Sequence, residues 1–357
     1  MVNDPFFKLL HVALGTDDIL SFTETEWQHC YQQAEKHCLV AFLFPVFQQY
    51  TKHNTRSHDS LFSKWFAQVV LTDDRNRLLN SRAKYLTDLF SSLGRRSCVL
   101  KGQGVASLYP NPKLRQPGDI DIWVEGGHDA VIRTLNDNCF RIRNIDYVHS
   151  GVKFFSDVEV EVHYRPSWLC FAPSNKRLQH YFLGRADEQF RHYDSSLGFS
   201  YPDISFNLVF SLIHINRHIF EDGIGLRQLL DYYYILINST PQERKDAFCV
   251  LSQLHLRRFT ESIMYVEQVA FGLPSEYLMC PPDRKGGEIL LNDILRGGNF
   301  GKYDKSNRFI PYNKYFVRGV YYFKRNIRFF SLCPYEVISM PIWKLWHYCW
   351  RKKKRYL

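Results

Sequence analysis

The sequence predicts an α+β fold with a small mixed β-sheet core, flanked by helical N-terminal and C-terminal regions. Apolar residues have helical spacing over 23–49 and 61–93, and again from residue 201 onward. Strand-like alternation is confined to the segment between these helical parts. The expected regions are 1–92, helical; 93–200, the sheet core; and 201–357, helical with a basic aromatic tail.

The N-terminal region is predicted to be helical. Thr23 and Glu26 have the spacing of a capping box, and the apolar pattern from Thr23 to Gln49 predicts one or two amphipathic helices. Leu61–Leu93 predicts one long helix, or two abutting ones, leading directly into the first strand. We expect these helices to form a domain or arm ahead of the sheet.

A glycine turn follows the first predicted strand, Cys98–Leu100, and leads into a helix-compatible segment, Val105–Tyr109. Backbone N–H groups at such a turn can bind phosphate, and a lysine there can neutralise a phosphate leaving group. The predicted phosphate-binding residues of this turn are Lys101, Gly102, Gln103 and Gly104.

The segment Gly118–Val124 alternates acidic and large apolar residues, which is typical of a half-buried strand. Asp119 and Asp121 therefore share one face, roughly 6.5–7 Å apart along the backbone. Carboxylates so placed can hold one or two Mg²⁺ ions, and the alternative is a surface strand with two solvated acids. Arg115, in the proline-rich loop before this strand, either reaches a phosphate or is an ordinary loop cation.

Two further strands are predicted after a helix over Asp129–Asn138. Val158–Tyr164 alternates strictly, and the run Tyr147–Phe155 before it is also strand-like. The two runs are separated by Ser156-Asp157, a pattern that indicates a β-hairpin.

The polar face of Val158–Tyr164 carries Glu159, Glu161 and His163. Exposure on an edge strand is a sufficient explanation for Glu159. Glu161 is the candidate third acid, which two bridged metal ions would need, and His163 is expected to orient it.

The order of a glycine turn, Asp-x-Asp on a strand and one acid on a later strand resembles the nucleotidyltransferase superfamily that includes DNA polymerase beta and the aminoglycoside nucleotidyltransferases. Residues roughly 25 to 240 are similar to a group of uncharacterised nucleotidyltransferase-family proteins. The segments that carry this likeness are Leu100-Lys101-Gly102, Leu108-Tyr109, Arg115, Asp119-Ile-Asp121, Glu161-Val-His163 and Leu226-Arg-Gln-Leu-Leu-Asp231. The turn departs from the superfamily, which usually has Gly-Ser or Gly-Gly there.

The resemblance implies a nucleotidyltransferase catalytic core that moves a nucleoside monophosphate from an NTP to an acceptor and releases pyrophosphate. Asp119, Asp121 and Glu161 would be catalytic and would hold two Mg²⁺ ions, or Mn²⁺, roughly 3.5–4 Å apart. The implied nucleotide-binding residues are Lys101, Gly102, Gln103, Gly104, Arg115 and His163. The acceptor stays open between a small molecule, a protein, a glycan intermediate and RNA. The alternative is a catalytically silent relative that binds nucleotide, nucleic acid or a membrane surface.

The C-terminal region contains two pairs of polar residues spaced four apart on predicted helices. His214 and His218 lack the glutamate of a zinc-protease motif, so they are structural histidines or donors that face a nucleotide. Arg227 and Asp231 predict a salt bridge on the surface of the next helix. The resemblance adds the alternative that this second pair faces the cleft.

The tail interleaves aromatic and basic residues over Lys314–Phe330 and Trp343–Tyr356, and contains the run Arg351–Arg355. Such a tail contacts nucleic acid or an anionic membrane surface, or it packs on the core with a solvated basic end. An anionic surface is therefore an expected partner besides the NTP donor.

The composition is that of a folded globular protein, with 45% hydrophobic residues in 357 and a net charge of +10, which favours anionic partners. Nine cysteines without a Cys-x-x-Cys pair indicate neither a disulfide framework nor a zinc site. Asp4 and Lys8 interrupt the N-terminal apolar run, and Cys38–Phe47 is too short to span a bilayer. We expect a soluble, cytoplasmic protein.

Overall fold

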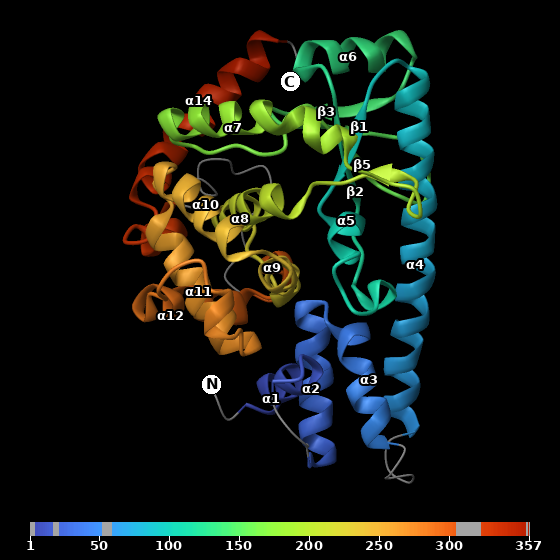
Figure 1. Ribbon diagram of the computed structural model, residues 1–357, viewed down its shortest axis with the longest axis vertical. Helices are drawn as coiled ribbons and strands as arrows, with labels where there is room; N and C mark the ends of the chain where they lie inside the picture. Colours follow the sequence, from blue (N-terminus) through green and yellow to red (C-terminus); the bar gives the residue numbers. More distant parts are fainter. Residues whose placement is uncertain (1–3, 17–20, 52–58, 305–322, 355, 357) are drawn as a thin grey trace.

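The computed structural model describes residues 4–16, 21–51, 59–304, 323–354 and 356. The predicted α+β fold is confirmed, because helices surround a small mixed sheet (Figure 1). Residues 314–322 and Arg355 of the predicted basic tail lie outside the described residues.

The helices account for most of the described chain. They are α1 (Pro5–Ala13), α2 (Glu24–His37), α3 (Val40–Thr51), α4 (Asp59–Ser92), α5 (Gly102–Ala106), α6 (Gly127–Asp137), α7 (Ala172–Arg191), α8 (Ile204–Glu221), α9 (Leu226–Ile237), α10 (Pro241–Gln253), α11 (Arg257–Phe271), α12 (Arg284–Gly297) and α14 (Pro334–Lys353), with the 3₁₀ turns η1 (Pro112–Leu114), η2 (Ser275–Tyr277), η3 (Asn299–Gly301) and η5 (Ile327–Phe329). Within the described residues, no helix combines the length and the apolar character needed to cross a membrane.

The main sheet has five strands in the order β1-β2-β5-β4-β3. Its strands are β1 (Ser97–Leu100), β2 (Ile120–Val124), β3 (Ile142–Ile145), β4 (His149–Val152) and β5 (Val160–His163); β6 (Tyr193–Asp194) and β7 (Phe199–Ser200) form a separate pair. Only β2 and β5 run parallel; the other neighbours are antiparallel. The predicted pairing of β4 with β5 is confirmed.

Two details of the predicted hairpin are wrong. The strands β4 and β5 are joined by residues 153–159, not by a two-residue turn at Ser156-Asp157. In addition, β5 is the central strand of the sheet and not an edge strand. Glu159 is still exposed, because it precedes β5 and pairs there with Arg143.

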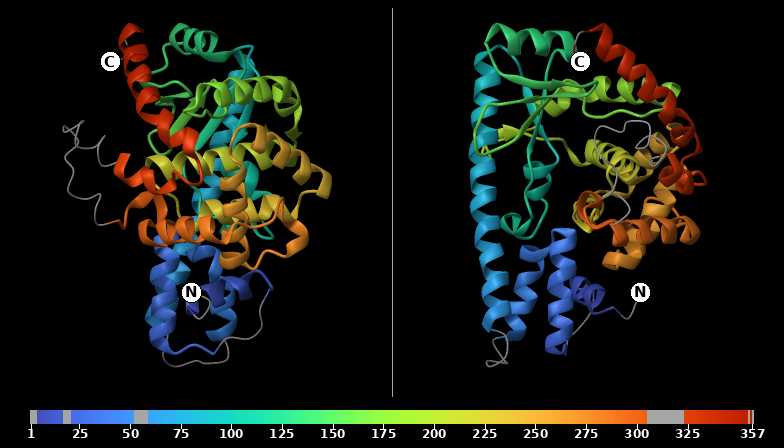
Figure 2. Two further views of the ribbon diagram at one scale, coloured as in Figure 1. Left: turned by 90° about the vertical axis from the view of Figure 1, so that its left-hand side faces the viewer. Right: turned by 180° about the vertical axis from the view of Figure 1, so that it is seen from behind.

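Helix α4 connects the N-terminal helices to the sheet (Figure 2). Its 34 residues span about 50 Å. Near its start, Trp65 stacks on Phe47 of α3 at 4.5 Å between ring centroids and donates a hydrogen bond to the carbonyl oxygen of Val40. Further along, the Asn76 side chain donates to the carbonyl oxygen of Arg115 at 2.9 Å, so this helix also holds the loop before β2.

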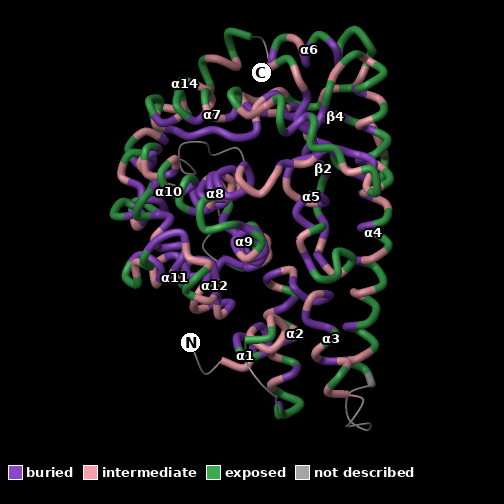
Figure 3. Tube along the Cα trace, viewed as in Figure 1, coloured by how far each residue is buried: buried purple, intermediate pink, exposed green. Residues whose placement is uncertain are grey.

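The C-terminal helices form the second large part of the core. In Figure 3, α8 and α9 are buried along most of their length, whereas α14 is largely exposed or intermediate. One side of α14 is nevertheless anchored. Glu336 accepts hydrogen bonds from the backbone N–H groups of Cys170 and Phe171, and Trp343 stacks on Trp168 at 3.7 Å.

Glu267 of α11 is fully buried, and its carboxylate oxygens have no hydrogen-bond partner within the described residues. Burial raises the pKa of Glu267 well above its usual range, so the folded protein favours the neutral carboxyl group. Because the folded-state pKa exceeds the unfolded-state value, the stability contributed by the neutral group is lost as pH rises through the folded-state pKa.

We therefore expect Glu267 to contribute a fall of about 1.4 kcal/mol per pH unit in the free energy of unfolding between its unfolded-state pKa and its raised folded-state pKa, and Glu267→Gln to remove this contribution. Urea denaturation at a series of pH values measures it. The exposed Glu276→Gln is the matched control. An unchanged slope in Glu267→Gln would contradict the assignment to Glu267.

Candidate active site

Three carboxylates meet where β2 and β5 lie side by side. Asp121 and Glu161 are register partners on these two parallel strands, and Asp119 lies one residue before β2. One oxygen of each carboxylate lies within 4.8 Å of the others. Asp121 is buried, Glu161 is half-buried and Asp119 is exposed at the pocket. The three predicted catalytic acids are thus brought together.

Two cationic groups flank Asp121. The Lys101 Nζ lies 3.0 Å from its Oδ1, and the His163 Nε2 lies 2.8 Å from the same atom. His163 is farther from Glu161, at 3.5 Å, so its main partner is Asp121 and not the glutamate that it was expected to orient. Lys101 has a φ of +53°, a conformation that costs a non-glycine residue on the order of 1–3 kcal/mol. This strained turn holds the lysine beside the acid.

The pKa values of the acids diverge. Burial raises the pKa of Asp121, but the charge of Lys101 and the hydrogen bond from His163 outweigh burial and hold it well below its usual range. Hydrogen bonds to Asp121 and Glu161 raise the pKa of His163 against the effect of burial. The negative charge of Asp121, followed by partial desolvation inside the pocket, raises the pKa of Asp119 to about 6, although part of the residue is solvent-exposed. The pocket therefore combines a carboxylate that stays ionised at low pH, Asp121, with one that takes up a proton at a higher pH, Asp119.

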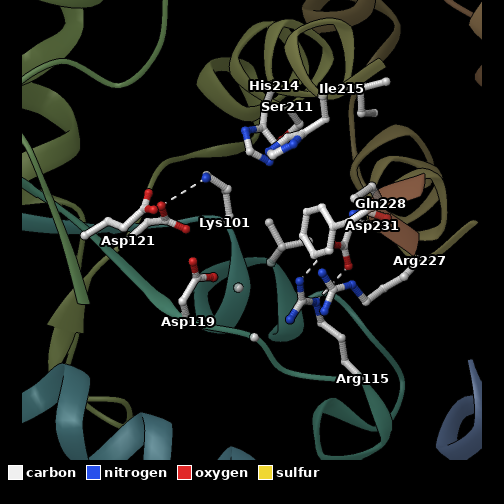
Figure 4. A pocket seen from close by; sticks show the side chains of 16 residues that line it. Lys101, Arg115, Asp119, Asp121, Ser211, His214, Ile215, Arg227, Gln228 and Asp231 are labelled. Carbon is white, nitrogen blue, oxygen red and sulfur yellow. Dashed lines mark hydrogen bonds and ion pairs between the residues drawn. The ribbon is translucent and has the colours of Figure 1, made fainter. Parts of the chain in front are cut away.

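The opposite wall of the pocket is cationic, with Arg115 and Arg227 facing Asp119 and Asp121 in Figure 4. The Arg115 Nε and Nη2 donate to Asp231 at 2.7 and 2.8 Å. Arg227 donates through Nη1 to the carbonyl oxygen of Gln116, while its buried Nε has no partner within the described residues. The predicted surface salt bridge between Arg227 and Asp231 is therefore wrong, and both residues line the pocket.

Helix α8 closes the pocket from a third side with His214 (Figure 4). His218 also lines the pocket, and the ring centroids of the two histidines lie 4.3 Å apart. Burial lowers the pKa of both imidazoles, that of His218 to about 3, and the charge of Lys101 adds to the effect. Both are therefore neutral near pH 7. The sequence left their placement open, and they face the candidate site.

Two residues of the predicted phosphate turn lie away from the pocket. The Gln103 side chain points to α4, where its Nε2 donates to Asn80 at 2.7 Å. Gly104 packs against Tyr201, since a Cβ there would lie 2.6 Å from the Tyr201 Cβ. Both positions serve packing in this structure, whereas Gly102 and Lys101 line the pocket.

His149 is a site residue that the sequence analysis missed. It lies on β4 opposite His163, and its Nδ1 is 3.3 Å from Glu161. Burial lowers the pKa of His149 to about 4, and the charge of His163 contributes further. The predicted pairing of Tyr147–Phe155 with Val158–Tyr164 was the available signal, but the turn predicted at Ser156-Asp157 pairs His149 with Tyr164, one residue away from the observed register.

The donor atoms fit a divalent cation. The three carboxylates supply the oxygen ligands that Mg²⁺ and Mn²⁺ prefer. A second, overlapping group consists of His149, Glu161 and His163, whose ligand atoms also lie within 4.8 Å of one another; its imidazole nitrogens suit metals such as Zn²⁺. The set of three carboxylates, Asp119, Asp121 and Glu161, is the one that was predicted to hold Mg²⁺.

A small mixed sheet with clustered carboxylates on neighbouring strands, facing cationic side chains across a pocket, is the arrangement of a nucleotidyltransferase-like protein. The model of the uncharacterised nucleotidyltransferase family matches residues 23–272, and the chain belongs to this family. A comparison with curated proteins found no match.

Proposed function

We propose that the protein is a divalent-metal-dependent nucleotidyltransferase that transfers a nucleoside monophosphate from an NTP to an acceptor hydroxyl. The acceptor oxygen forms a bond to the α-phosphorus, the bond from that phosphorus to the α,β-bridging oxygen breaks, pyrophosphate leaves and the hydroxyl proton is released. The observation that carries the proposal is the set of three carboxylates, Asp119, Asp121 and Glu161, opposite Arg115 and Arg227 in one pocket.

In this proposal the acidic side chains bind the metal and the cationic side chains bind the phosphates. Asp119, Asp121 and Glu161 would hold the metal, which when bound would neutralise the phosphates and lower the pKa of the acceptor hydroxyl. Arg227 and Lys101 bind phosphate oxygens from the other sides of the pocket. Because such transfer depends mainly on positioning and charge neutralisation, no covalent protein intermediate is needed.

Calorimetric titration tests the proposal without a known acceptor. The α,β-methylene analogue of each NTP is titrated with and without Mg²⁺ into the wild-type protein and the Asp119→Asn/Asp121→Asn variant. Binding that requires Mg²⁺ and is lost in the double variant supports the proposal. Absence of binding to the wild-type protein would instead support a catalytically silent relative.

Lys101→Met is expected to change two affinities in opposite directions. Removing the ammonium 3.0 Å from Asp121 takes away one of the two cationic neighbours of that carboxylate, so Mn²⁺ alone binds about tenfold more tightly. The NTP analogue loses a cationic partner and binds about tenfold more weakly. Mn²⁺ electron paramagnetic resonance and calorimetry measure the two, with the exposed Lys113→Met as control. A change of both affinities in the same direction would contradict this role of Lys101.

A further inference from the structure

Apolar side chains are concentrated on one exposed part of the molecule. Nine of the seventeen exposed large apolar side chains in the described residues lie between Phe323 and Tyr348. Within α14, Ile338, Ile342 and Leu345 are 56%, 68% and 66% exposed and lie three to four residues apart, with Trp346 beside them. This spacing places them along one side of the helix, here called the outer face of α14.

The outer face is exposed because the opposite side of the helix is already fixed. Glu336 bonds to the backbone of the segment before α7, Trp343 stacks on Trp168, and His347 lies 2.7 Å from Asp146. Rotation of the helix to bury Ile342 would break these contacts. An apolar groove lined by Leu169, Phe171 and Trp346 adjoins the same face.

The segment that carries this face is strongly basic. Over residues 323–354 the one acidic residue is Glu336, and it is buried. Lys352 and Lys353 are exposed at the end of α14 that follows the apolar face, and the next residue, Lys354, pairs with Asp129. The combination of aliphatic side chains, a tryptophan and lysines on one surface helix is typical of helices that lie in the interface of an anionic membrane.

We propose that the outer face of α14 docks the protein onto an anionic lipid bilayer. The aliphatic side chains enter the boundary between headgroups and acyl chains, Trp346 lies at headgroup depth and the lysines contact lipid phosphates. A second copy of the chain fits less well, because the one acidic residue of 323–354, Glu336, is buried and gives the lysines of the other copy no counter-charge in this segment. RNA fits less well, because the three most exposed side chains of the face, Ile338, Ile342 and Leu345, are aliphatic and offer bases no ring on which to stack.

Vesicle co-sedimentation of the full chain tests this inference, using phosphatidylcholine alone and phosphatidylcholine mixed with phosphatidylglycerol. We expect binding to the anionic vesicles to be at least about tenfold tighter and to weaken with salt. Ile338→Gln/Ile342→Gln/Leu345→Gln and, separately, Lys352→Glu/Lys353→Glu should each reduce it about tenfold or more. Leu183→Gln on α7, at a position 73% exposed, is the matched control and should bind normally.

Fluorescence provides a second measurement: brominated lipids should quench the wild-type protein and not the triple glutamine variant. Equal binding to neutral and anionic vesicles, or full binding by the triple variant, would overturn the inference. The inference would also be overturned if light scattering showed a dimer for the wild-type protein and a monomer for the triple variant. The same holds if the wild-type protein bound RNA and not vesicles, and the triple variant lost that RNA binding. Mg²⁺-dependent NTP binding by these variants is measured separately, so the proposed function is tested independently.

Discussion

Glu161→Gln is expected to weaken Mg²⁺-dependent binding of the NTP analogue at least about 100-fold, since even partners of metal ligands commonly contribute 10–100-fold. The substitution preserves the size of the side chain but removes one of three clustered charges and one ligand oxygen. It also removes the carboxylate that lies close to His149 on the neighbouring strand β4 and to His163 on β5 itself. Calorimetry against Mg²⁺ and the analogue measures the loss.

Glu159→Gln is the matched control for this experiment. Glu159 lies two residues earlier in the same segment, is exposed and does not line the pocket. The same chemical change there should leave nucleotide binding within about twofold of wild type, as expected for an exposed ion pair. Equal effects of the two substitutions would show that Glu161 has no specific role.

Asp231→Leu is expected to lower the free energy of unfolding by about 3–5 kcal/mol. The Arg115 side chain is 5% exposed, and the substitution removes both hydrogen bonds to its guanidinium as well as its counter-charge. It also removes the acceptor for the buried Tyr109 hydroxyl group, 2.7 Å away. Denaturation in urea, followed by circular dichroism, measures the change.

The double variant Arg115→Met/Asp231→Leu should be more stable than Asp231→Leu alone, because it leaves no unpaired buried charge. Arg227→Met serves as the control, since Arg227 lines the same pocket without a carboxylate partner within the described residues. We expect this control to cost less than about 1 kcal/mol. A similarly small cost for Asp231→Leu would contradict a structural role for the ion pair.

Much of the sheet could be predicted from the sequence, because alternation directly reports which residues share a face. That pattern defined the strands containing Asp121 and Glu161, and the capping box at Thr23 and the long helix α4 also formed as expected. These signals are local, because each depends only on residues that are close together in the sequence, within one helix or one strand. The register that brings the acids together follows once β2 and β5 are neighbours.

Contacts between residues far apart in the sequence could not be predicted from these local patterns. Arg115 and Asp231 are separated by 116 positions, and the spacing of Arg227 with Asp231 suggested a competing local pair. Gln103 has the position of a phosphate contact, yet Asn80 on α4 supplies its partner. His149 precedes its neighbour His163 by fourteen residues across a hairpin whose turn was placed incorrectly. In each case tertiary packing, not local pattern, decided the partner.

The central position of β5 has a consequence for how the protein folds. Of the five strands of the main sheet, β5 is the last in the chain, yet it lies between β2 and β4. Strands made earlier therefore cannot complete the sheet until Val160–His163 has left the ribosome and inserted between them. Pairings between distant segments of this kind slow folding. We expect the three acids, which repel one another, to come together only in this late step, when burial of Val160 and Val162 compensates for their repulsion.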